Sequence, residues 1–168
     1  MEVRTAASPR DVKHYTTDRL REEFLIEDLF QADEIKLVYS HIDRIITGSA
    51  VPVNKKLDLT AGSELRAEYF LQRREMGLIN IGGDGVVIVD GRVYEIKARD
   101  GMYIGRGSKD ISFESKDAAN PAKFYLNSCP AHTEYPTVHI KLEGEPEEGV
   151  VIVKDENKVE MGTLEDSN

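Results

Sequence analysis

The sequence predicts an all-β domain with a short N-terminal helix, and three observations support that prediction. Strand-like runs rich in β-branched residues recur about every 8–12 residues, with glycine-rich turns between them. Asp90-Gly91 lies between two alternating runs, which is a strong signal for a two-residue hairpin of type I′. No helical periodicity is visible after the first 30 residues. The pattern is typical of an antiparallel sandwich or barrel.

The expected elements follow in chain order. A turn or two of helix is expected within residues 19–30, with Thr17-Asp18 as its cap. Strands are then expected at residues 34–40, 41–48, 51–59, 68–75, 77–83, 85–89, 92–96, 101–105, 110–115, 122–127 and 137–142. A final hairpin is expected over residues 150–162, with its turn at Asp155 to Lys158.

Composition and length set the protein class. With 168 residues and 40% hydrophobic content, the chain can bury one core of ordinary size. No apolar run is long enough to span a membrane, and the N-terminus has no apolar region typical of a secretory signal. A single cysteine, Cys129, excludes an intramolecular disulfide and suits a reducing cytoplasm. The sequence therefore predicts a cytoplasmic protein without a membrane partner.

The net charge of −9 is concentrated at one end of the chain. Residues 143–168 contain nine acidic and two basic side chains, which leaves the first 142 residues close to neutral. Binding of nucleic acid needs a basic face that displaces counterions, so nucleic acid is not expected as a partner. The acidic run is interpreted as a solvated loop.

The glycines around residue 83 resemble a nucleotide-binding loop only superficially. Gly82, Gly83 and Gly85 would need to lie between a strand and a helix to bind a pyrophosphate. A hairpin follows them instead, so we expect turns or bulges at a corner of the barrel.

The stretch from Leu65 to Glu114 has the outline of a cupin barrel without its metal ligands. In metal-binding cupins an H-x-H pair precedes a glutamate and a glycine, and Glu75 and Gly82 fit that second half. The histidine positions fall on Glu68 and Phe70, or on Tyr69 and Leu71. The second cupin motif (Pro, Gly, His) is represented by Gly105, Gly107 and Asp110. The resemblance implies a cupin-like antiparallel β-barrel or jelly roll, with no metal ligands in this chain.

The first group of candidate site residues is His41, Asp43 and Arg44. If residues 41–48 form a strand, alternation places His41 and Asp43 on one face and Arg44 on the other. A hydrogen bond between His41 and Asp43 would fix the imidazole tautomer for acid–base catalysis. The alternative is a structural polar pair at the barrel rim or at a subunit contact.

The second group is Arg73, Arg74 and Glu75, on the strand that carries metal ligands in other cupins. An arginine that faces into the mouth of the barrel could bind a substrate carboxylate through two parallel hydrogen bonds. An Arg–Glu pair at the surface or at an interface is the alternative.

Several segments are similar to the N-terminal half of the 5-keto-4-deoxyuronate isomerases, also called 4-deoxy-L-threo-5-hexosulose-uronate ketol-isomerases. The most distinctive are VYSHIDRIITG, YFLQRREMGLINIGG and AKFYLNSCPAHTEYPT, and the closing MGTLEDSN also matches. The similarity covers residues 2–142 and 162–168. The chain is identified as a member of this family from these motifs.

The resemblance implies a cytoplasmic zinc isomerase that assembles as a hexamer. Its reaction converts 5-dehydro-4-deoxy-D-glucuronate to 3-deoxy-D-glycero-2,5-hexodiulosonate during the breakdown of pectin and related uronate polymers. Family members are bicupins whose zinc ligands lie in the second half, so no zinc is expected to bind to this chain. The partners implied are a hexuronate-derived substrate and further copies of the chain.

Two classes of function therefore remain open. In the first, the chain is the metal-free scaffold half of the isomerase and is inactive, or nearly so, by itself. In the second, it is a metal-free cupin module that binds an acidic sugar or mediates oligomerisation without catalysis. The expected organisation is a leader and helix over residues 1–30, a metal-free cupin-like barrel over 31–142, and an acidic loop with a hairpin over 143–168, which leads toward a second cupin half.

Overall fold

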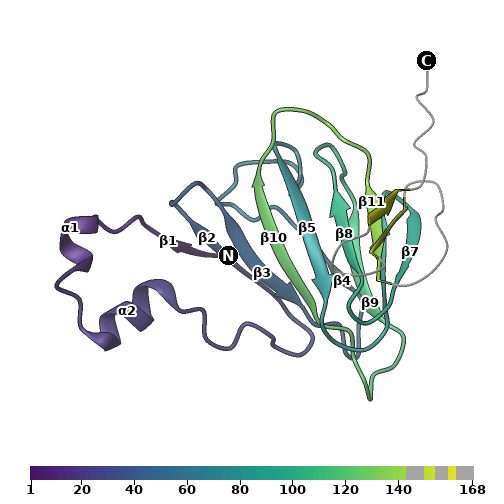
Figure 1. Ribbon diagram of the computed structural model, residues 1–168, viewed down its shortest axis with the longest axis horizontal. Helices are drawn as coiled ribbons and strands as arrows, with labels where there is room; N and C mark the ends of the chain where they lie inside the picture. The colour runs from purple at the N-terminus through teal and green to yellow at the C-terminus, as the bar shows by residue number, and fades with distance from the viewer. Residues whose placement is uncertain (143–149, 154–158, 162–168) are drawn as a thin grey trace.

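The computed structural model describes residues 1–142, 150–153 and 159–161, and Figure 1 shows two short helices to one side of a predominantly β structure. The helices are α1 (Pro9–Val12) and α2 (Thr17–Phe24). The strands are β1 (Glu2–Arg4), β2 (Ile35–Ser40), β3 (Ile46–Ala50), β4 (Leu57–Asp58), β5 (Arg74–Asn80), β6 (Gly85–Val89), β7 (Arg92–Ile96), β8 (Gly101–Ile104), β9 (Ile111–Ser115), β10 (Phe124–Pro130), β11 (Val138–Lys141), β12 (Val150–Val153) and β13 (Val159–Met161). The predicted all-β class is confirmed. None of the helices in these ranges has the length and apolar character needed to cross a membrane.

The strands are organised in two sheets. One has nine strands in the order β1-β2-β3-β10-β5-β8-β11-β12-β13, and the other has four in the order β4-β9-β6-β7. Most neighbours are antiparallel, whereas β1–β2 and β11–β12 are parallel. The described strands do not close into one continuous barrel, so the cupin-like fold has the jelly-roll form of two packed sheets.

The two sheets pack face to face around a single hydrophobic core. Phe124 of β10 and Phe113 of β9 meet there with ring centroids 5.4 Å apart, and both side chains are fully buried. Met76 in β5 faces the same core, whereas Ile79 on the same strand is exposed on the outer face of the nine-stranded sheet. Because of this alternation, such a strand directs one set of side chains toward the core and the other set toward the outer face.

The hairpin between β6 and β7 is confirmed at the predicted residues. Val89 pairs with Arg92, and Asp90 and Gly91 between them have φ values of 49° and 84°. Positive φ at both central positions is the signature of a type I′ turn, which matches the twist of the flanking strands.

The expected short N-terminal helix is present, but it begins earlier than the sequence predicts. Thr16 caps α2 by accepting a hydrogen bond from the Arg19 backbone N–H, and Leu25 ends the helix with extended dihedral angles. The expected cap at Thr17-Asp18 is therefore wrong, because both residues lie inside the helix. No residue of α2 is buried, so no core packing extends the helix further.

The glycine corner after β5 is organised by one buried amide. The Asn80 side chain donates to the Gly83, Ile96 and Lys97 carbonyls and accepts from the Gly82 and Lys123 backbone N–H groups. A Cβ atom on Gly83 would lie 2.0 Å from the Asn120 carbonyl oxygen, so a larger residue does not fit. The predicted corner role of these glycines is consistent with this geometry.

The C-terminal strands extend the nine-stranded sheet of their own chain. β12 pairs with β11 in parallel and with β13 in antiparallel orientation. The strands of the expected final hairpin are thus confirmed. The expected turn at Asp155 to Lys158 and the acidic loop before Val150 lie outside the described residues.

Candidate functional site

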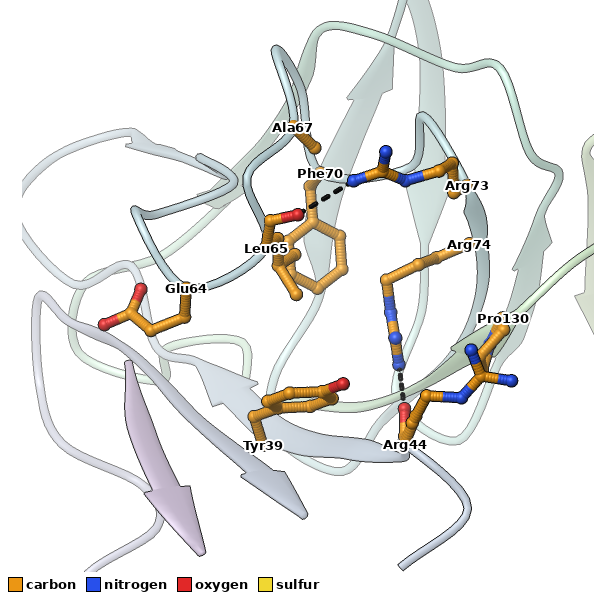
Figure 2. Close-up of a pocket in the computed structure, with 9 residues that line it drawn as sticks. All are labelled: Tyr39, Arg44, Glu64, Leu65, Ala67, Phe70, Arg73, Arg74 and Pro130. Atoms are coloured by element: carbon orange, nitrogen blue, oxygen red, sulfur yellow. Dashed lines mark hydrogen bonds between the residues drawn. The ribbon is translucent and has the colours of Figure 1, made fainter. Parts of the chain in front are cut away.

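The candidate site is a cavity of about 220 Å³ at the start of β5, beside the β2–β3 turn, and Figure 2 shows the residues that line it. Side chains come from the end of β2, the following turn, the loop before β5, the start of β5 and the end of β10. The lining consists of Tyr39, Arg44, Glu64, Leu65, Ala67, Phe70, Arg73, Arg74 and Pro130. Three arginines and one acidic residue thus surround a space that is walled in part by apolar side chains.

Arg74 is the most buried cation of the cavity. It is 6% exposed, and its position as the first inward-facing residue of β5 directs it between the sheets. Its Nε donates to Ser128 Oγ at 3.1 Å, and its Nη2 donates to the Ser128 and Arg44 carbonyl oxygens at 2.8 and 2.6 Å. The guanidinium carbon lies 5.7 Å from the centroid of the Tyr39 ring. These contacts fix the orientation of the guanidinium in the cavity.

The charge of Arg74 has neutral partners. No carboxylate of the described residues lies within salt-bridge distance of Arg44, Arg73 or Arg74. Desolvation by burial lowers the pKa of Arg74, and the nearby Arg44 cation lowers it further, whereas Tyr39 and Cys129 raise it. Buried charges in proteins are usually paired with an opposite charge, so this guanidinium is a departure from the rule.

Arg73 and Arg44 supply charge at the rim. Arg73 is exposed, and its Nη2 donates to the Leu65 and Arg66 carbonyls at 2.9 and 3.1 Å, as Figure 2 shows for Leu65. The Arg44 side chain makes no hydrogen bond within the described part of the chain. The Glu64 carboxylate is directed away from the arginines toward the amino group of Met1, at 3.7 Å.

The expectation of a continuous strand through His41 and Asp43 is wrong. β2 ends at Ser40 and β3 begins at Ile46, and the residues between them form the turn of a hairpin. Asp43 and Arg44 have φ values of 52° and 55°, and the Ile45 N–H donates to the Ile42 carbonyl at 3.3 Å. Strand alternation therefore does not apply to this segment.

The turn separates the three candidates of the first group. His41 is exposed, and its ring packs edge-on against Tyr39 with centroids 5.6 Å apart. Asp43 is exposed and makes no hydrogen bond to His41. Of the three, the structure brings only Arg44 into the cavity lining.

Glu75 lies on the opposite side of the sheet from Arg74. Its carboxylate accepts a hydrogen bond from the Tyr103 hydroxyl at 2.8 Å and one from Cys129 Sγ at 3.5 Å. Desolvation and the Glu75 carboxylate raise the pKa values of both Tyr103 and Cys129. Neighbouring side chains in a strand point to opposite faces, so an Arg74–Glu75 pair does not form.

The donor groups around the site do not fit a zinc ion. In the described ranges no three His, Cys, Asp or Glu side chains gather closely enough to hold a metal. Glu75 and Cys129 are neighbours, but the third member of their group is the phenol of Tyr103. Zinc sites in proteins need three or four imidazole, thiolate or carboxylate ligands.

The sequence did not single out Tyr39 and Ser128, and it marked Phe70 only as a position where metal-binding cupins carry a histidine. Tyr39 lies just before the SHIDR segment, and strand alternation in β2 places it on the inner side with Leu37. Ser128 faces inward on β10 two residues after the buried Leu126. A small polar residue at an inward position was the available signal for a buried polar partner.

Comparison with known proteins gives consistent results. Residues 24–150 match the model of the KduI/IolB family. The chain is 72% identical over all 168 residues to a protein of Lachnoclostridium phytofermentans named 4-deoxy-L-threo-5-hexosulose-uronate ketol-isomerase, and 60% identical to the protein of that name from Lachnospira eligens. It spans 57% and 58% of the length of these two relatives.

Among solved structures, a Cupin_2 domain of an XRE family transcriptional regulator from Enterobacter cloacae matches 61% of this chain and 100% of that chain, with a TM-score of 0.48 and 13% identity. The family match covers most of the residues that form the two sheets and the arginine cavity. The chain belongs to the KduI/IolB family.

Proposed function

We propose that the chain serves a 4-deoxy-L-threo-5-hexosulose-uronate ketol-isomerase as its metal-free scaffold lobe. The observation that supports this most strongly is the 72% identity to the Lachnoclostridium phytofermentans relative, which extends over the whole chain. The reaction proposed is the interconversion of 5-dehydro-4-deoxy-D-glucuronate and 3-deoxy-D-glycero-2,5-hexodiulosonate in pectin and uronate catabolism.

The reaction is an internal redox exchange between neighbouring carbons. The aldehyde carbon is reduced to an alcohol while the adjacent alcohol carbon is oxidised to a ketone, so no external oxidant is needed. An enediol route requires a base at the carbon acid and a group that stabilises the oxyanion. Zinc, which the family resemblance assigns to the second half, supplies a Lewis acid for such an oxyanion when bound.

The residues of this chain are better suited to support than to proton transfer. His41 and Asp43 are exposed and unpaired with each other, and Arg74 is held by Ser128 and by the Arg44 backbone. None of them forms the base-and-orienter arrangement that general base catalysis requires. By itself the 168-residue chain is proposed to be inactive, or nearly so.

The same proposal includes assembly and location. The lobe is proposed to work in the cytoplasm as part of a homo-oligomer, a hexamer by family resemblance. Three apolar side chains in α2 and directly after it are 38–46% exposed, namely Leu20, Phe24 and Leu25. Exposed apolar side chains of this kind suit a contact with another copy of the chain. The division into residues 1–30, 31–142 and 143–168 is retained as the proposed domain organisation.

A second candidate function is supported by the arginine cavity. A metal-free cupin module that binds an acidic sugar would need a cationic pocket of small size, and the cavity has that character. This candidate predicts binding of a hexuronate without turnover.

The proposal is tested by joining this chain to the remaining residues of the Lachnoclostridium phytofermentans relative. The fusion is expected to convert the hexulose uronate in a coupled assay and to contain zinc, whereas the 168-residue chain is expected to do neither. A folded fusion with no activity would contradict the isomerase assignment. Turnover by the 168-residue chain at the rate of the fusion would contradict its role as a scaffold.

A further inference from the structure

The cavity at the start of β5 has an excess of positive charge that the described residues do not neutralise. Arg44, Arg73 and Arg74 line it, whereas its one acidic residue, Glu64, is engaged with the amino group of Met1. Arg74 is buried and fixed by neutral oxygen atoms alone. Such a guanidinium is prepared to meet an anion, because its desolvation has already occurred during folding.

We propose that this cavity binds the carboxylate of a small sugar acid through Arg74, with Arg73 and Arg44 closing over it from the rim. The choice of a uronic acid as ligand rests on the proposed function, whereas the preference for an anion rests on the cavity alone.

The available donors match a planar monoanion. Nε and Nη2 of Arg74 are committed to Ser128 and to the Arg44 carbonyl, and Nη1 makes no hydrogen bond to the described residues. Nη1 of Arg74, the Arg44 guanidinium and the Tyr39 hydroxyl supply a few donors from different directions. A carboxylate has two oxygens to satisfy, fewer than the three terminal oxygens of a phosphate monoester.

The size and walls of the cavity fit a sugar-sized molecule. About 220 Å³ is below the roughly 300–1,000 Å³ of pockets for drug-sized ligands, so a small acid is favoured. Phe70, Leu65 and Pro130 supply apolar contact for the carbon skeleton of a sugar acid. Figure 2 shows the Phe70 ring between Arg73 above and Tyr39 below, with the Arg74 side chain beside it.

The geometry of the β2–β3 turn also serves such a site. Arg44 holds a left-handed backbone conformation, and its carbonyl accepts the hydrogen bond from Arg74 Nη2. The Arg44 carbonyl therefore orients the buried Arg74 guanidinium, and the Arg44 guanidinium offers a second positive charge to the ligand. Residues in this conformation are uncommon outside glycine and cost energy, and they concentrate at functional sites.

The proposal is tested by titration calorimetry of the full 168-residue chain with sodium galacturonate, in parallel with galactose and with inorganic phosphate. Galacturonate is expected to bind, and galactose is expected not to, because it lacks the carboxylate. Arg74→Lys and Arg74→Met are each expected to weaken binding about tenfold or more, and Arg44→Gln and Arg73→Gln by smaller factors. Arg92→Gln, on the exposed β7 strand, is the matched control and should leave binding unchanged.

Three outcomes would overturn the proposal: no heat of binding with galacturonate, equal binding of galactose, or tighter binding of phosphate. The rim variants alter exposed side chains, so they test the site even if a variant of Arg74 does not fold. Calorimetry requires no turnover. A negative calorimetry result would therefore not contradict the isomerase assignment. An inactive fusion protein would likewise not contradict the proposed anion site.

Discussion

The two sides of β5 place adjacent charged residues in different surroundings. On the inner side, the buried Arg74 cation is held by a serine and two carbonyl groups, with no carboxylate among the described residues. On the outer side, the half-buried Glu75 carboxylate is held by a phenol and a thiol, and no cation in the described part of the chain bonds to it. The inner side opens to a cavity, whereas the outer side belongs to the face of the nine-stranded sheet.

This difference teaches that opposite charges next to each other in a strand are not an ion pair. Each charge has to find partners on its own face of the sheet. Arg74 and Glu75 both use neutral donors or acceptors, and β10 supplies Ser128 on the inner side and Cys129 on the outer side. The inner arrangement leaves a positive charge available for a ligand, and the outer arrangement suppresses ionisation of its neighbours.

The largest expected effect comes from the inner side, in the hydrophobic core between the two sheets. Phe124→Ala removes a fully buried ring that contacts Phe113 across the sheets, and it is expected to lower the free energy of unfolding by about 4 kcal/mol. Tyr125→Ala, on the outer side of the same strand, is the control and should cost clearly less. Equal losses in chemical denaturation would contradict the assignment of inner and outer faces.

A smaller loss is expected where the inner charge is held. Ser128→Ala removes the oxygen that accepts from Arg74 Nε, and the buried guanidinium then has one partner fewer. We expect a loss of about 1–2 kcal/mol in the free energy of unfolding. Cys129→Ala on the outer side is the matched change, and its effect in the same urea titration should be below that of Ser128→Ala.

Much of the architecture could be predicted from the sequence, because it depends on local patterns. Asp90-Gly91 fixes its hairpin through residues that accept positive φ. The alternation in GLINIGG and in AKFYLN indicates the two central strands of the larger sheet. The bounds differ, because β5 begins at Arg74 and residues 68–73 of the expected preceding strand form turns and bends. In these segments the local preference and the tertiary packing agree.

The β2–β3 turn could not be predicted in the same way. Its central residues, Asp43 and Arg44, also have positive φ, but arginine has no preference for that conformation. The continuous β-branched character of the flanking residues favoured a strand instead. The turn is imposed by the pairing of Tyr39 with Ile46 and by the hydrogen bond from Arg74 to the Arg44 carbonyl.

The candidate site was predicted only in part. Arg73 and Arg74 were identified as residues at the opening, and both line the cavity. The separation of Arg74 from Glu75 follows from strand alternation, which the sequence already contained. Tyr39 and Glu64 reach the cavity through contacts distant in sequence, and such contacts depend on the packing of the whole fold.

On the outer side, the chemistry of Cys129 gives a pH-dependent prediction. Desolvation, the hydrogen bond to Glu75 and the charge of Glu75 raise the pKa of the thiol, and Arg74 partly opposes this. Since the thiolate is the reactive form, alkylation by iodoacetamide should be slower than for an exposed thiol and should accelerate only at higher pH.

Glu75→Gln removes the negative charge that raises this pKa, whereas the glutamine amide oxygen can still accept a hydrogen bond from the thiol. The rate–pH profile is then expected to shift to lower pH, while desolvation keeps the midpoint above that of an exposed thiol. Glu95→Gln, on a strand of the other sheet, is the matched control. An unchanged profile in Glu75→Gln would show that Glu75 does not act on Cys129.

The smallest expected effect is that of Tyr103→Phe. The change removes one hydrogen bond to a half-buried carboxylate, so the free energy of unfolding should fall by about 1 kcal/mol or less. Because the Glu75 carboxylate loses the hydrogen bond from the Tyr103 hydroxyl, the rate of Cys129 alkylation is also expected to change. Thermal unfolding and the alkylation rate together check this prediction. A loss of unfolding free energy larger than that of Phe124→Ala would contradict the expectation that changes on the inner face cost more than changes on the outer face.

The central claim is that Arg74 is a buried cation prepared to bind a carboxylate. The most direct measurement is the side-chain Nε–H resonance of Arg74 in nitrogen-15 NMR, assigned by its loss in Arg74→Lys, during titration with sodium galacturonate. We expect a slowly exchanging resonance in the free protein that shifts with galacturonate and does not shift with galactose. A resonance that is insensitive to galacturonate, or that shifts equally with both sugars, would contradict the claim.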